Sequence, residues 1–152
     1  MKQLRIFLAA ALFLLFASAV FAGDYTSVPA PDSFRGLKWG TPLADIKGLM
    51  PVKKSGFHDT YFRKSERRTF GDADIDSVAY YFRKDKLYRV GVAFTGRANH
   101  FLIKERLISM YGPGRGVGTR YGWMWPKFSV ELDFNDNAGS GALYYTYEGA
   151  VQ

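Results

Sequence analysis

The chain has 152 residues, a formal net charge of +7, 47% hydrophobic and 17% aromatic residues, and no cysteine. Without cysteine, disulfides, thiolate metal sites and a lipoprotein anchor are all excluded. The basic excess favours anionic partners but carries no information about the fold.

The first segment, residues 1–22, has the three parts of a cleavable secretory signal. Lys2 and Arg5 give a positive start, an apolar run extends to Val20, and Ala22 occupies the last position before a cut at Gly23. A transmembrane anchor is the alternative, but the run is shorter than the roughly 20 apolar residues that span a bilayer. We therefore expect a periplasmic or secreted protein with no transmembrane segment after signal cleavage.

The mature chain is predicted to begin with an extended lead-in, residues 23–33, which contains Pro29 and Pro31 and little apolar patterning. A short helix is predicted next, over residues 41–49. Thr41 is a typical N-cap, Pro42 is preorganised for the first helical position, and Pro51 ends the element.

Three strand patterns follow the predicted helix, over residues 57–64, 75–84 and 87–94. The alternating residues Val78, Tyr80 and Phe82 share one face of the second pattern. The third pattern places Tyr88, Val90, Val92 and Phe94 on one side and Arg89, Gly91 and Ala93 on the other. Lys84-Asp85-Lys86 reads as the hairpin turn between these two strands.

The second half of the chain repeats this order. A helix is predicted over residues 98–111, with an apolar stripe at Ile103, Leu107 and Met110 or Tyr111, and the following Gly112-Pro113-Gly114 ends it. Three strands then follow, over residues 119–125, 128–134 and 142–148, with Pro126-Lys127 as the turn between the first two.

These patterns predict that residues 34–152 form a single α+β domain of two helix-plus-three-strand units. The antiparallel sheet is expected to keep one face wet, while both helices pack on the other face. The predicted core lies between the sheet and the two helices and contains Val90, Val92, Phe94, Val130, Leu132 and Phe134.

Two short motifs carry a family resemblance. The segment from Trp39 to Ile46 resembles the Gly-[Ser/Thr]-x-x-x-[Val/Ile] helix start of small exported bacterial proteins, and Tyr111-Gly112-Pro113 resembles their helix end. Examples of these proteins are the β-lactamase inhibitor protein and the small outer-membrane assembly lipoproteins. The resemblance implies a helical unit packed on an antiparallel sheet whose exposed face binds another protein, although the lipoprotein cysteine is absent here.

No catalytic, cofactor-binding or metal-binding residue is assigned from the sequence. A metal site would need His58, Asp59 and His100 to meet in space, and the two histidines lie in different segments. Glu131 and Asp133 have the spacing of a sugar-cleaving acid pair, but alternating polar residues of a strand are normally solvated. The glycine-rich loop 112–118 ends a helix, so it lacks the helix start of a phosphate-binding loop.

Basic residues near aromatic ones form the candidate binding surface for an anion or a partner. They are Arg63, Lys64, Arg67, Arg68, Arg83, Lys84, Lys86 and Arg115. The first seven form one patch if the strands that carry them adjoin. Export argues against nucleic acid and favours an envelope protein or an anionic envelope component; a solvated basic edge that discourages strand pairing is the alternative. We therefore expect a noncatalytic binding or protein-interaction module, and the alternative is an envelope-directed hydrolase with an unlocated site.

Overall fold

The structure is a computed structural model that describes residues 26–54 and 56–151; the predicted signal peptide, residues 1–22, lies outside this range. The elements in chain order are β1 (Ser33–Phe34), β2 (Leu37–Lys38), a 3-10 turn (Leu43–Asp45), β3 (Leu49–Pro51), β4 (Thr60–Arg63), β5 (Thr69–Phe70), β6 (Ala73–Asp74), β7 (Ser77–Arg83), β8 (Lys86–Thr95), α2 (Arg97–Tyr111), β9 (Arg115–Val117), β10 (Arg120–Trp125), β11 (Phe128–Asn135), β12 (Ser140–Tyr147) and a second 3-10 turn (Glu148–Val151).

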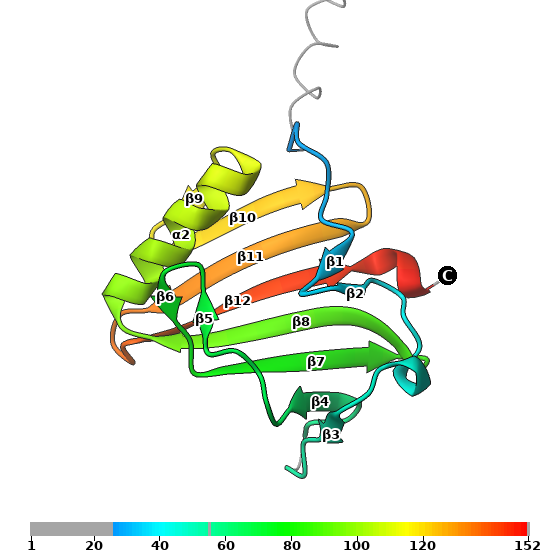
Figure 1. Ribbon diagram of the computed structural model, residues 1–152. Coiled ribbons are helices and arrows are strands. Elements are labelled where there is room, and N and C mark those ends of the chain that lie inside the picture. The colour runs from blue at the N-terminus through cyan, green and yellow to red at the C-terminus, as the bar shows by residue number, and fades with distance from the viewer. Residues whose placement is uncertain (1–25, 55, 152) are drawn as a thin grey trace, which may run out of the picture.

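One eight-stranded antiparallel sheet dominates the fold, in the order β3-β4-β7-β8-β12-β11-β10-β9. The first four of these strands follow one another along the chain, α2 then crosses the sheet, and the last four return so that β12 lies beside β8 (Figure 1). The prediction of two helix-plus-three-strand units is therefore wrong, because the described chain has one α-helix and is mainly β-sheet.

The helix predicted over residues 41–49 is absent. Only the 3-10 turn Leu43–Asp45 forms there, and β3 begins after three more residues, at Leu49. The backbone is instead tied to the turn between β7 and β8: Leu43 N–H donates to Asp85 O over 2.8 Å, and Leu87 N–H donates to Thr41 O over 3.0 Å. The eight residues between Pro42 and Pro51 are too few to offset the cost of starting an isolated helix, so these pairings prevail.

The long strands and the helix over residues 98–111 are confirmed by β7, β8, α2, β10, β11 and β12. The predicted turns are also present. Lys84 and Asp85 adopt φ values of 48° and 59°, and Lys127 adopts 63°, in the positive-φ region that tight hairpin turns require. The sequence misses the short strands β1, β2, β3, β5, β6 and β9, which are only two or three residues long.

A β-bulge between Tyr81 and Phe82 changes the side of the sheet on which Tyr88 lies. The register shift pairs Phe82 with Leu87 and Tyr81 with Arg89, so Tyr88 falls out of the alternation. Leu87 is fully buried in the core, and Tyr88 lies instead against the guanidinium of Arg83. The prediction that Tyr88 shares a side with Val90 is therefore wrong, since a bulge inserts one residue into the period-two pattern.

The core lies between the sheet and three covering pieces on one of its faces. These are α2, the N-terminal segment with β1 and β2, and the β5–β6 hairpin (Figure 1). All six predicted core residues are at most 3% exposed, which confirms that set. The cover differs from the prediction, because the N-terminal segment occupies the place expected for a first helix.

Aromatic side chains and hydrogen bonds fix the N-terminal segment to the sheet. The ring of Trp39 lies 5.3 Å from that of Phe128, and Phe34 is 5% exposed. Trp125 donates its indole N–H to Val28 O over 2.6 Å, so part of the predicted lead-in is anchored as well. No helix within residues 26–54 and 56–151 is long and apolar enough to cross a membrane.

Candidate functional site

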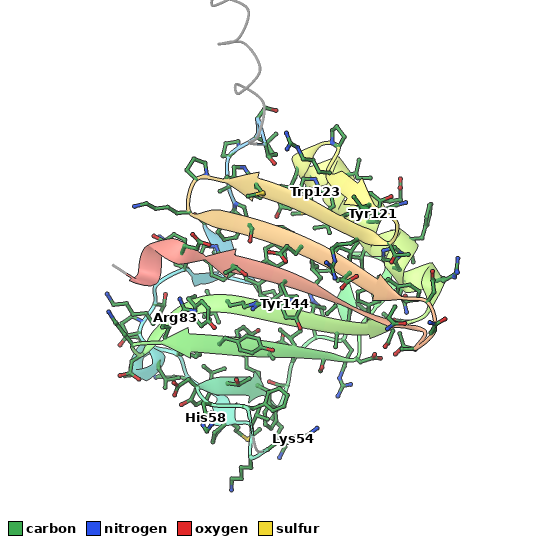
Figure 2. All side chains as sticks on the ribbon, turned by 180° about the vertical axis from the view of Figure 1, so that it is seen from behind. Lys54, His58, Arg83, Tyr121, Trp123 and Tyr144 are labelled. Atoms are coloured by element: carbon green, nitrogen blue, oxygen red, sulfur yellow. The ribbon has the colours of Figure 1, made fainter. Side chains whose placement is uncertain are left out.

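Within residues 26–54 and 56–151, no helix or hairpin covers the opposite face of the sheet (Figure 2). Its residues alternate along each strand with those of the core, as expected for a sheet that is packed on one side only. One row across six strands runs Ala79, Gly91, Tyr144, Glu131, Gly122 and Arg115. Three of these six residues, Ala79, Gly91 and Gly122, are small, so the larger side chains next to them stand above a low surface. We call this surface the open face.

An arginine between two tyrosine rings occupies the open face at the β7–β8–β12 strands. The guanidinium of Arg89 lies 4.1 Å from the ring centroid of Tyr144 and 6.0 Å from that of Tyr81. Gly91 makes room for the rings, because a Cβ there would lie 2.9 Å from Tyr144 Cε1 and 3.3 Å from Tyr81 Cε2. We call Tyr81, Arg89 and Tyr144 the Arg89 cluster.

The charge of Arg89 is not neutralised within the described part of the chain, where no carboxylate lies within 4.0 Å of it. Its Nε is buried and has no hydrogen-bond partner there. Burial, followed by the influence of Tyr144, raises the pKa of Tyr81, so this phenol stays neutral at physiological pH. Two aromatic rings therefore hold a cation whose terminal nitrogens are available to an outside acceptor.

The predicted basic residues do not form one patch. The strands β4 and β7 adjoin, as the prediction required, but they pair antiparallel, with Thr60 opposite Tyr81 and Tyr61 opposite Tyr80. Arg63, Lys64, Arg67 and Arg68 therefore lie near the Val78 end of β7, around a cavity of about 130 Å³.

Arg83, Lys84 and Lys86 lie at the other end of β7, at its turn into β8. Val78 and Arg83 are five positions apart along this strand, or about 17 Å at the usual rise of an extended chain. The guanidinium of Arg83 lies 4.3 Å from the ring centroid of Tyr88 on β8. Figure 2 shows Arg83 at the strand end, away from Tyr144.

Arg115 lies at the far edge of the sheet, on β9. This strand forms from the glycine-rich loop 112–118 and pairs with β10, with Arg115 opposite Gly122. The sequence predicts a flexible loop here, since a three-residue strand has too few side chains to show alternation. Arg115 is thus separated from both of the other basic groups by the width of the sheet.

The two histidines that the sequence singled out stay apart, whereas Glu131 and Asp133 are two positions apart on the exposed side of β11. His58 is exposed near β4, whereas the His100 ring on α2 stacks 5.0 Å from that of Phe134. Asp133 on β11 forms an ion pair of 3.1 Å with Arg120 and is exposed. Within the described residues, no group of three His, Asp or Glu side chains could hold a metal ion.

Sequence reasoning missed Arg89 and Tyr144 as site residues, although a signal for Arg89 was present. The alternation of residues 87–94 placed Arg89 and Gly91 on the side away from the core, and Arg89 is the one basic residue inside that strand pattern. What the pattern could not show is that β12 lies beside β8 and brings Tyr144 over Gly91. Comparison with protein-family models, curated proteins and solved structures finds no match to this chain, so the family resemblance of the two short motifs stays a prediction.

Proposed function

We propose that the mature chain is a noncatalytic, exported interaction module whose open face binds an acidic protein of the bacterial envelope. The observation that carries the proposal is the Arg89 cluster, a cation held between two tyrosine rings with no carboxylate within reach in the described chain. Arginine and tyrosine are the side chains most enriched among residues that dominate protein interfaces. A partner carboxylate would give Arg89 the bidentate contact for which its planar group is suited.

The size of the open face suits a protein partner. Neighbouring strands lie about 4.8 Å apart and seven residues extend about 24 Å, so the five strands from β7 to β10 give a face of roughly 24 Å by 24 Å. This is of the same order as the ~800 Å² that each partner buries in a stable complex. The small side chains around the Arg89 cluster allow a partner's backbone to approach closely.

Affinity capture with matched variants tests this proposal. The mature protein is immobilised and exposed to bacterial envelope extract, alongside Arg89→Ala, Tyr144→Ala and the control Phe101→Ala. Phe101 is 55% exposed on α2, on the other side of the sheet, so its removal deletes a comparable apolar side chain from a different surface.

Wild type and Phe101→Ala are expected to retain the same acidic protein, and both open-face variants to retain about tenfold less, the scale of an interface residue of central importance. Arg89→Lys should fall between them, since it keeps the charge and loses the bidentate geometry. Retention should also decrease as salt rises, because exposed charges are screened over about 8 Å at physiological ionic strength. Equal retention by all variants would contradict the proposal.

A further inference from the structure

A second candidate site lies on the covered side of the sheet, away from the open face. It is a cavity of about 240 Å³ between the N-terminal segment at β1, the β5–β6 hairpin and the C-terminal half of α2. Figure 1 shows these three elements over the same face of the sheet. The cavity is smaller than the roughly 300–1,000 Å³ of sites for drug-sized ligands, so it suits a small molecule.

Arg35, Arg67 and Arg106 line this cavity, one from each of three separate segments. Arg35 is neutralised by Glu66 at 2.5 Å and donates to Arg67 O over 2.9 Å and to Thr69 O over 2.6 Å. These bonds fix the backbone at Arg67 and Thr69. Arg35 therefore holds one wall of the cavity in place, and its own charge is already balanced by Glu66.

The positive charges of Arg67 and Arg106 are not balanced by an ion pair in the described chain. In the part of the chain that the structure describes, neither has a carboxylate within 4.0 Å. The stem of Arg106 packs over Gly71 of the β5–β6 turn, where its Cγ and Cδ would lie 3.6 Å from an added Cβ. Two unbalanced cations at one cavity, with one of them held by packing, favour an anionic occupant.

Two buried phenols complete the polar part of the cavity. Tyr145 is 3% exposed and Tyr111 is 6% exposed, and burial raises the pKa of each. The charges of Arg106 and Arg35 act on Tyr145 in the opposite direction, so both guanidinium groups lie near this phenol. The two hydroxyls also hydrogen-bond to each other, a contact that acts upward on the pKa of Tyr145 and downward on that of Tyr111, so Tyr145 donates to Tyr111. At physiological pH both phenols are neutral, and the Tyr111 hydroxyl keeps a proton that it can donate to an anion. Phe70 and Met110 supply an apolar wall beside them.

We propose that this cavity binds a small organic anion, a phosphate monoester or carboxylate carried on a short apolar or aromatic group. The anionic end is held by Arg67 and Arg106, and the apolar end contacts Phe70 and Met110. The site is independent of the open face, because none of the residues that line it belongs to the Arg89 cluster.

Binding of phenyl phosphate to the mature protein, followed by calorimetry and by backbone amide NMR shifts, tests the proposal. The variant Arg67→Gln/Arg106→Gln is compared with Arg83→Gln/Lys84→Gln, which removes the same two charges at the β7–β8 turn. All four side chains are exposed, and thermal melts check that both variants are folded.

Wild type should bind phenyl phosphate saturably, and more tightly than inorganic phosphate, with shifts at α2 and the β5–β6 hairpin. The Kd should rise about tenfold or more in the cavity variant, which loses two charge-assisted contacts, and by less than about twofold in the control. Met110→Glu should weaken binding as well, since it introduces a carboxylate one helical turn from Arg106.

Unsaturable binding by wild type, or equal weakening in both double variants, would overturn the proposal, because net charge alone would then explain the effect. Competition by phosphatidylglycerol vesicles distinguishes two possible sources of the bound anion, a lipid headgroup and a free solute. Displacement of phenyl phosphate by the vesicles supports the site and assigns a lipid headgroup. Saturable binding that vesicles leave unchanged supports it and assigns a free solute.

Discussion

The Leu132→Ala variant tests the assignment of the core face directly. Leu132 is fully buried at the middle of β11, paired on one side with Leu143 of β12 and on the other with Tyr121 of β10. The substitution removes three carbons, worth about 2.4 kcal/mol at ~0.8 kcal/mol for each. A flanked central strand cannot collapse into the space, and the cavity cost raises the expected loss to about 3–4 kcal/mol, within the range of emptied leucine sites.

Urea denaturation followed by far-ultraviolet circular dichroism gives this free energy of unfolding, provided the slope with denaturant is the same for both proteins. Leu102→Ala is the matched control, because it makes the same deletion at a helix position that is 36% exposed. We expect the control to lose less than about 1 kcal/mol, as most surface changes do. A loss of that size for Leu132→Ala would refute the assignment of the buried face.

Three further predictions follow from local features. Gly141→Ala should destabilise the fold strongly, because its Cβ would meet Phe94 Cζ at 2.4 Å and Asp133 O at 2.5 Å, whereas Gly122→Ala, whose nearest neighbour is 4.0 Å away, should have little effect in the same denaturant assay. Burial is the main cause that lowers the pKa of His100 in the folded state, so the unfolded chain binds the proton more readily; stability should fall as pH drops below about 6.5, the usual histidine value. This loss should disappear in His100→Gln and persist in the control His58→Gln, and a pH profile unchanged by His100→Gln would contradict it. N-terminal sequencing of exported protein should begin at Gly23; a chain that retains Met1 and sediments with membranes would instead be anchored.

The local pattern of the sequence determined the long elements and their buried sides. Strict alternation in β11 and the 3.6-residue stripe of α2 correctly identified Val130, Leu132, Ile103 and Leu107 as core. The spacing of apolar residues along an element indicates its buried side directly, because a strand or helix that lies on a core must present apolar residues on one side. The turns at Lys84-Asp85 and Pro126-Lys127 were equally readable, since two-residue hairpin turns require a few particular residue types.

The tertiary structure decided what depends on contacts between distant segments. A strong helix-start signal at Thr41-Pro42 yielded to backbone pairing with the β7–β8 turn, and that pairing cannot be read from the segment alone. Antiparallel pairing of β4 with β7 placed the two basic groups at opposite ends of one strand, although the sequence allowed a single patch. Tyr144 reaches Arg89 only because β12 returns beside β8, and the arginine-lined cavity draws its walls from three segments. Periodicity records which face of an element is buried, whereas the identity of the neighbouring element depends on how the whole chain closes its core.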